Sequence, residues 1–359
     1  MKNILLIFFL AATLSAQEPQ PDEYLVGAHY YAWYNKASWD RIPAEPLLGG
    51  YSSRDHYAVN QHILWAHRYG IKFFGIGWTG QDRTTDDVIQ EYILKSPEID
   101  KIKFCIAYDT LTRFRRVMEP PFDFSNKKLY KEFVSDFDYL SRTYFSHPQY
   151  LKFSGRPVVW LYLSRGMRGN WVRALQAARD TVARNGYDLY IDGDLLWPER
   201  TDTSRLPYFD AASAYVLNQK EMFLKEGIQT TGQVVDLASA FFHEWARVVP
   251  SVRNYNTGDP VAFHPVINPQ FIKPSDPGAL RYSMQNVDEF RAFAELARDT
   301  ATYSAAAGAK VVWITSWNEW YEGTTIEPTH NGPTLDTNYG FQLLEVIRDV
   351  FKTPASEPQ

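Results

Sequence analysis

The stretch from Lys310 to Pro328 combines a short apolar run with a cluster of acidic and aromatic side chains. Its sequence is K-V-V-W-I-T-S-W-N-E-W-Y-E-G-T-T-I-E-P. The β-branched and aromatic residues Val311 to Thr315 predict a strand that is buried on both faces. Glu319 and Glu322 follow this strand and lie three residues apart. On one helical turn this spacing places two Cβ atoms about 5–6 Å apart, which suits an acid and a base that act on one sugar ring.

The aromatic residues around these carboxylates point to the same chemistry. Acidic residues after a strand more often cap a helix or lie in solvent, and aromatic residues are often only core. Here Trp317, Trp320 and Tyr321 are interleaved with the carboxylates and do not follow core periodicity. The whole chain is 16% aromatic, with 11 Trp and 23 Tyr. Aromatic faces pack against the C–H faces of sugar rings, so the pattern favours a carbohydrate site.

Length, charge and cysteine content exclude several other classes of protein. A chain of 359 residues with 45% hydrophobic residues can bury one large barrel or two ordinary domains. A net charge of -5 without a basic run argues against a nucleic acid or an anionic membrane as partner. The single cysteine, Cys105, excludes a disulfide within the chain, and we expect it to be a buried, inert thiol.

The N-terminus has the layout of a secretory signal peptide. Lys2 precedes an apolar run from Ile4 to Leu14, and the small residues Ser15 and Ala16 follow it. This run is too short to span a bilayer. We therefore expect a signal peptide at 1–16, a polar spacer at 17–23 and export to the periplasm or the extracellular space. No cysteine lies near the cleavage point to carry a lipid anchor.

The remainder of the chain alternates between predicted strands and predicted helices. Besides the strand before Glu319, apolar runs predict strands at Tyr24 to Tyr30, Lys72 to Gly77, Lys103 to Ala107, Pro157 to Leu163, Asp188 to Ile191, Ala211 to Tyr215 and Val261 to Ile267. Helical spacing or caps predict helices from Ser53 or Asp55 to Tyr69, at Leu129 to Phe145, Trp171 to Asn185 and Gly232 to Val249, around Phe290 to Ala297, and at Phe341 to Phe351.

Eight strands that alternate with helices favour a single (β/α)8 TIM barrel over residues 24–354, with a loose tail at 355–359. An open doubly wound sheet is the alternative, but no G-x-G-x-x-G and no P-loop follows any strand. In a barrel, residues at the carboxyl ends of the strands converge on one face. We expect an aromatic-walled polar cleft there, which binds substrate through Tyr31, Trp33, Tyr34, Trp78, Asp192, Tyr215, His264, Trp317, Asn318, Trp320 and Tyr321, with Asp109 and Asp194 on the same face.

Motifs for other chemistries are weak in this chain. There is no G-x-S-x-G and no H-E-x-x-H, and His62 and His67 lie five residues apart on a predicted outer helix. Asp192-Gly193-Asp194 resembles the acidic motif with which many glycosyltransferases hold a metal. Three residues match by chance often, so a sugar-binding aspartate is the stronger interpretation. We expect no metal and no cofactor.

Three segments carry a resemblance to glycoside hydrolase family 99, the endo-acting α-mannosidases and α-mannanases. They are I-T-S-W-N-E-W-Y-E-G-T-T-I-E-P at 314–328, G-A-H-Y-Y-A-W-Y at 27–34 and P-L-L-G-G-Y-S-S-R-D at 46–55. The last segment adds Tyr51 and Asp55 to the expected substrate-binding residues. The resemblance implies that Glu319 and Glu322 are the catalytic pair. Trp317 and Tyr321 stand where typical members carry Phe and His.

The resemblance also implies a mechanism in which the substrate supplies the nucleophile. Glu319 would remove the proton from the sugar 2-hydroxyl, which attacks the anomeric carbon to give a 1,2-anhydro sugar, and Glu322 would protonate the leaving oxygen. Most retaining glycosidases instead flank the scissile bond with two carboxylates. Here both candidates follow the last strand, and neither the fourth nor the seventh predicted strand ends in Glu.

The sequence therefore favours an exported, monomeric, retaining endo-α-glycosidase that acts on an α-mannan-type polysaccharide or oligosaccharide. Three alternatives stay open. They are an α-glucanase related to the family 71 α-1,3-glucanases, a non-catalytic carbohydrate-binding barrel, and a glycosyltransferase.

Overall fold

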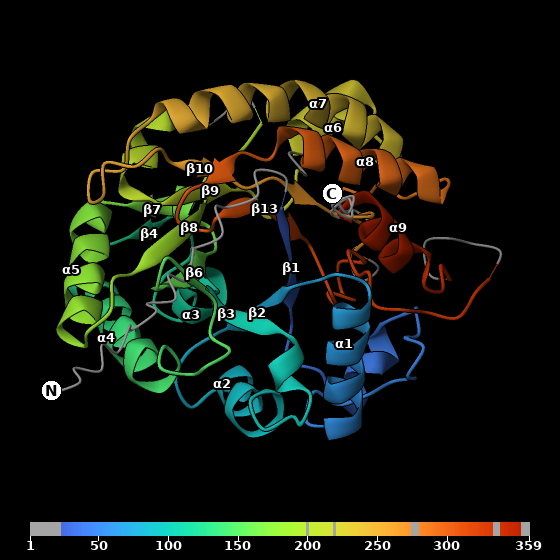
Figure 1. The fold of residues 1–359 in the computed structure, drawn as a ribbon, viewed down its shortest axis with the longest axis horizontal. Helices are drawn as coiled ribbons and strands as arrows, with labels where there is room; N and C mark the ends of the chain where they lie inside the picture. The colour runs from blue at the N-terminus through green and yellow to red at the C-terminus, as the bar shows by residue number, and fades with distance from the viewer. Residues whose placement is uncertain (1–22, 199–200, 218–219, 274–279, 333–337, 353–359) are drawn as a thin grey trace, which may run out of the picture.

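A nearly closed barrel of mostly parallel strands, surrounded by helices, makes up most of the described structure (Figure 1). The computed structural model describes residues 23–198, 201–217, 220–273, 280–332 and 338–352. The predicted signal peptide at 1–16, the spacer up to residue 22 and the tail at 355–359 lie outside the described residues. The prediction of a (β/α)8 barrel is confirmed.

The barrel strands occur at the positions that the apolar runs predict. They are β1 (Tyr24–Tyr30), β2 (Phe73–Trp78), β3 (Lys103–Tyr108), β6 (Arg156–Leu161), β8 (Tyr190–Asp194), β9 (Ala211–Ser213), β10 (Ala262–Phe263), β11 (Val266–Ile267) and β13 (Ala309–Ile314). Their order in the sheet is β10-β9-β8-β6-β3-β2-β1-β13-β11, and all these neighbours pair in parallel. Short strands β5 (Lys152–Phe153) and β12 (Tyr303–Ser304) pair antiparallel with β6 and β13.

The seventh predicted strand is divided in the structure, and its two parts lie at the two ends of the sheet. Its first part, β10, pairs with β9, and its second part, β11, pairs with β13. His264 and Pro265 lie between the two parts, and proline has no N–H to donate to a ladder. The Pro265 carbonyl still accepts a 2.9 Å hydrogen bond from the N–H of Trp313, so the stretch stays against β13.

The outer layer consists of helices whose apolar faces pack on the barrel. They are α1 (His56–Arg68), α2 (Thr84–Val88), α3 (Thr110–Phe114), α4 (Lys127–Thr143), α5 (Trp171–Arg184), α6 (Lys220–Glu226), α7 (Thr231–Val248), α8 (Val287–Thr300) and α9 (Gln342–Val350). On α4 the buried residues Leu129, Phe133, Phe137 and Leu140 recur at helical spacing, as predicted. The connection between β8 and β9 differs from the others, because its described residues contain only the 3₁₀ helix η5 (Thr203–Tyr208).

Aromatic rings fill the inside of the barrel. The His29 ring stacks on Trp313 with centroids 4.6 Å apart and lies 4.2 Å from the ring of Trp160. A Cβ on Gly75 would stand 2.6 Å from the Trp313 ring, so this position accepts only glycine beside that ring. Burial lowers the pKa of His29 to about 3, which keeps this imidazole neutral. The barrel interior is thus a packed floor beneath the cleft.

Two further expectations concern Cys105 and the membrane. Cys105 is buried and carries no disulfide, and burial raises the pKa of its thiol, as expected of an inert side chain. Among the described residues, none of the helices has the length and apolar character needed to cross a bilayer.

Candidate active site

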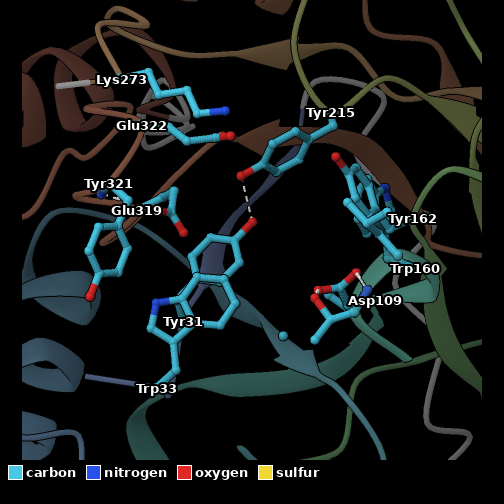
Figure 2. A pocket seen from close by; sticks show the side chains of 14 residues that line it. Tyr31, Trp33, Asp109, Trp160, Tyr162, Tyr215, Lys273, Glu319, Tyr321 and Glu322 are labelled. Carbon is cyan, nitrogen blue, oxygen red and sulfur yellow. Dashed lines mark hydrogen bonds between the residues drawn. The ribbon is translucent and has the colours of Figure 1, made fainter. Parts of the chain in front are cut away.

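A cavity of about 250 Å³ lies at the carboxyl ends of the barrel strands (Figure 2). Six of the predicted site residues line it, namely Tyr31, Trp33, Tyr215, Glu319, Tyr321 and Glu322. The rest of its wall consists of Gly77, Ala107, Asp109, Leu111, Thr112, Trp160, Tyr162 and Lys273. The fold therefore brings the two glutamates that follow β13 into one ring-lined space.

Glu319 lies at the buried end of this pair, with 4% of its surface exposed. Its N–H donates to the Ser316 hydroxyl at 2.6 Å, and its Oε1 accepts from the N–H of Tyr321 at 3.0 Å. Burial raises the pKa of Glu319 well above its ordinary value, and the negative charge of Glu322 raises it further. The backbone hydrogen bonds from Tyr321 and Glu322 oppose this shift.

Glu322 is only partly buried and has two polar neighbours in the cavity. Burial raises its pKa, while the ammonium of Lys273 and the hydroxyl of Tyr215 lower it. The Tyr31 hydroxyl donates to the Tyr215 oxygen at 2.6 Å, which leaves the Tyr215 proton free to point at Glu322 (Figure 2). Two tyrosines that follow β1 and β9 thus connect the floor of the cavity to the second glutamate.

The opposite wall carries a third carboxyl group between aromatic rings. Asp109 caps α3 by accepting from the N–H and the hydroxyl of Thr112, at 3.0 and 2.6 Å. Burial raises its pKa, and those hydrogen bonds oppose the shift. Trp160 and Tyr162 stand beside it and face the glutamates across the cavity (Figure 2). A bound sugar would lie between these rings and the carboxyl pair.

Several predicted binding residues lie behind the cavity wall, where they fasten the loop that carries the glutamates. The Asn318 side chain accepts from the Tyr31 N–H at 2.7 Å and donates to the Tyr31 carbonyl at 3.0 Å. The Tyr34 hydroxyl donates to the Asn318 carbonyl at 2.7 Å and accepts from the Trp320 N–H at 3.0 Å. Trp317 is fully buried, and its ring packs against Phe74 of β2.

Glu327 is the centre of a second, fully buried anchor for the same loop. One of its oxygens accepts from the Tyr51 hydroxyl at 2.7 Å and from the Trp320 indole at 3.0 Å. The other lies 3.0 Å from Nε2 of His62 on α1. Tyr51 and Trp320, which we expected to contact substrate, therefore hold the loop through Glu327 and lie outside the cavity lining.

The predicted residues Asp192 and His264 lie inside the barrel. Asp192 accepts from Ser213 at 2.8 Å and from the Trp313 indole at 2.8 Å, and one of its oxygens lies 2.7 Å from Nδ1 of His264. Asp194 pairs with Arg165 and accepts from the Tyr215 N–H at 3.2 Å. Protein donors thus engage both carboxylates of the Asp192-Gly193-Asp194 motif. In the part of the chain that the structure describes, no cluster of three His, Cys, Asp or Glu side chains could hold a metal ion.

The last two predicted binding residues serve the framework. Asp55 caps α1 by accepting from the Tyr57 N–H at 2.9 Å. The Trp78 indole donates to Asp86 at 2.7 Å, away from the cavity, and the ring is completely buried.

Seven residues of the wall were not predicted at this face, and three of them, Trp160, Tyr162 and Lys273, carry aromatic or charged side chains. Trp160 and Tyr162 are two positions apart, so strand alternation predicts that they share a face, but alternation alone does not say whether that face meets the cavity. Lys273 lies in the loop after β11, where no periodic pattern marks it. Backbone pairing brings it here, since the N–H groups of Ile272 and Lys273 both donate to the carbonyl of Glu322, at 2.9 and 3.3 Å.

A (β/α)8 barrel whose strand ends hold paired carboxyls among aromatic rings has the architecture of carbohydrate-active enzymes. Comparison of families makes the assignment specific. The chain belongs to the family described as "Glycosyltransferase WbsX", which matches residues 31–347. No curated protein sequence matches this chain.

Solved structures with the same fold are glycoside hydrolases by their descriptions. A "Glycoside hydrolase-like protein" is 20% identical with a TM-score of 0.70, over 96% of this chain and 98% of that one. A family 99 endo-α-mannosidase from Bacteroides thetaiotaomicron, bound to bis-tris propane, is 20% identical with a TM-score of 0.64, over 91% and 97%. A second structure of that enzyme gives 18% and 0.62, over 92% and 98%. The resemblance to family 99 predicted from the motifs is thus confirmed at the level of fold.

Proposed function

We propose that the protein is a retaining α-glycosidase that cleaves inside an α-mannan-type polysaccharide or oligosaccharide. The observation that carries this proposal is the convergence of Glu319 and Glu322 in one ring-lined cavity. The fold shared with two endo-α-mannosidase structures supports the choice of substrate class. We also propose that the enzyme is exported, on the basis of the signal-like sequence at residues 1–16.

In the proposed mechanism the substrate 2-hydroxyl is the nucleophile. Glu319 removes its proton, the oxygen attacks the anomeric carbon, and Glu322 protonates the leaving glycosidic oxygen. Water, activated by Glu322, then opens the 1,2-anhydro sugar, and Glu319 returns the proton to the 2-oxygen. Each attack inverts the anomeric centre, so the product retains its configuration.

The surroundings of the two carboxyls suit these roles. Burial makes Glu319 a stronger base than an exposed carboxylate, because its pKa is raised well above the ordinary value of 4.5. Burial also raises the pKa of Glu322, which favours the protonated form that an acid needs. The two groups share the cavity, so the protonation of one lowers the pKa of the other.

The description of the family favours one alternative, a glycosyltransferase that uses a nucleotide sugar. Such an enzyme would use Asp192-Gly193-Asp194 to hold the metal of its donor. The carboxylates of that motif are engaged by Trp313, Ser213 and Arg165 and do not line the cavity. Hydrolysis is therefore the function that the geometry supports better.

Incubation with a panel of α-mannans and α-glucans tests the proposal. We expect shorter oligosaccharides whose new reducing ends are first seen by NMR as the α-anomer. Glu319→Gln and Glu322→Gln should each lower the rate by about 10²- to 10⁴-fold, the usual contribution of one proton transfer. Glu91→Gln, which alters an exposed glutamate on the outer surface, is the matched control and should leave the rate unchanged.

Other outcomes would assign the barrel to another class. Cleavage of α-glucans alone would select the α-glucanase. Binding of glycans without any product, in the wild type and in both glutamine variants, would identify a non-catalytic barrel. Transfer from a nucleotide-sugar donor without hydrolysis would identify a glycosyltransferase.

A further inference from the structure

Lys273 brings a positive charge to a cavity whose other ionisable groups are acids and tyrosines. Among the described residues that line the cavity, it is the only lysine or arginine. Figure 2 shows its ammonium directed toward the carboxyl group of Glu322. Among the described residues, the ammonium of Lys273 interacts electrostatically with Glu322 and lowers the pKa of that carboxyl group. Glu322 is therefore its counter-charge among the described residues, and this counter-charge is lost when Glu322 is protonated.

The backbone of Ile272 and Lys273 is held against the loop that carries the two glutamates. Ile272 and Lys273 both donate to the carbonyl of Glu322, and Gly323 leaves space for the Ile272 side chain. A Cβ on Gly323 would stand 2.2 Å from Cγ1 of Ile272, which shows how closely the two loops approach. The position of the lysine beside Glu322 thus follows from main-chain pairing.

This lysine opposes the role that the proposed function gives to Glu322. An acid must hold its proton, and the ammonium of Lys273 lowers the pKa of Glu322. The groups that face this pair are Glu319, Asp109, Tyr215 and Tyr162. Burial raises the pKa of each of these groups and so favours its neutral, protonated form. When Glu322 carries the proton, none of these groups supplies a settled counter-charge for Lys273.

We propose that the sugar bound in this cavity carries an acidic substituent, a carboxylate, sulfate or phosphate, which pairs with Lys273. This inference rests on the proposed glycosidase function and specifies its substrate class. A neutral mannan has no group that requires an ammonium. An anionic substituent would form a charge-assisted hydrogen bond with Lys273 and offset its effect on Glu322. The correct substrate thereby restores the protonated acid, so recognition and catalysis are coupled.

Polysaccharides prepared in matched pairs test the proposal. Each pair has one sugar skeleton, with the acidic group present or removed: a uronate polymer and its carboxyl-reduced form, a sulfated polymer and its desulfated form, and a phosphomannan and its dephosphorylated form. We expect the wild type to cleave the acidic member of one pair with a kcat/KM about 10- to 100-fold higher, the range for one hydrogen bond to a charged group. The pair that shows the preference identifies the substituent.

Variants at position 273 tie this preference to the lysine. Lys273→Met should abolish the preference, mainly by raising KM for the acidic member, while Lys273→Arg should retain most of it. Lys131→Met, which removes an exposed charge on α4, is the control and should behave as the wild type. Binding to the same pairs, measured by calorimetry on the Glu322→Gln protein, gives a readout that does not depend on turnover.

The possible outcomes separate this inference from the proposed function. Faster cleavage of the neutral member, or an acid preference unchanged in Lys273→Met, overturns the inference and leaves the glycosidase function intact. If no polysaccharide is cleaved but acid-selective binding is lost in Lys273→Met, the glycosidase function is overturned and the anion site stands. Loss of both readouts overturns both.

Discussion

Gly323, directly after Glu322, is the position where a single methyl group should disturb the site most sharply. Its φ of +66° lies in the left-handed region, and the missing Cβ would overlap the side chain of Ile272. Gly70, just past α1, also has a positive φ, of +86°, but no atom lies within 4 Å of the place of its Cβ. The two glycines therefore separate backbone strain from steric overlap.

The expected magnitudes follow from this comparison. Alanine in the left-handed conformation costs roughly 1–2 kcal/mol at both positions. The reduced chain entropy of the unfolded state offsets about 0.4–1 kcal/mol of this cost at both. At Gly323 the main-chain hydrogen bond from Ile272 to Glu322 restrains the loops from separating, so overpacking adds about 1–3 kcal/mol. Gly323→Ala should thus be the more destabilising variant by that last amount.

Urea denaturation of the two alanine variants measures this difference as a change in the free energy of unfolding. Turnover should fall only in Gly323→Ala, because that variant displaces the Glu322 carboxyl. In an Ile272→Ala background the overlapping atoms are gone, so the additional cost of Gly323→Ala should disappear. Equal losses of stability in the two single variants, or an undiminished cost in the Ile272→Ala background, would refute the packing argument.

Two further predictions concern the buried carboxyls. Because the pKa of Glu319 is raised above 4.5 in the folded state, its ionisation costs stability as the pH rises from 4.5 through that raised pKa. Glu319→Gln stays neutral, so it should unfold at a higher temperature than the wild type at about pH 8, and the two melting temperatures should converge below about pH 4; a constant difference would contradict this origin. Glu327→Gln should lower the free energy of unfolding by about 1.5–3 kcal/mol, since three donors lose a charged acceptor. Glu327→Gln should also reduce kcat more than it raises KM. Steady-state kinetics, with Glu91→Gln as the control variant, would measure both constants, and an unchanged kcat would show that Glu327 serves stability alone.

The fold could be predicted because each barrel strand is a short apolar run and each major helix has a periodic apolar face. The structure differs from the predicted elements where this apolar pattern is weak. The segment at Thr84–Val88 and the π-helical turn after it, Ile89–Ile93, carry no long apolar stripe, and the sequence did not reveal them. The seventh strand was predicted as continuous because periodicity does not register the missing N–H of Pro265.

The site could be predicted only in part, because a loop has no periodicity that says which way a side chain points. Trp320 and Tyr321 are adjacent and both aromatic, yet one contacts Glu327 behind the wall and the other lines the cavity. Trp320 donates its N–H to the Tyr34 hydroxyl and its indole N–H to Glu327, which also accepts from Tyr51, and the Tyr321 ring stacks on Tyr34. These contacts join residues that are far apart in the sequence. Lys273 was not predicted, for the same reason. It lines the cavity because the backbone of its loop is hydrogen-bonded to the carbonyl of Glu322.

The motif at 314–328 therefore combines two tasks in one loop, and this division explains its unusual composition. Glu319, Tyr321 and Glu322 face the cavity, where a change of charge alters chemistry. Between and around them, Asn318, Trp320 and Glu327 fasten the loop to the residue after β1, to the segment at 46–55 and to α1. Two carboxyls on one loop keep a fixed relation only if that loop is rigid, since a shift of about 1 Å in a reacting group can cost 10²-fold in rate. The buried side chains of Asn318, Trp320 and Glu327 supply this rigidity. The motif therefore contains both the residues that line the cavity and the residues that hold them in place.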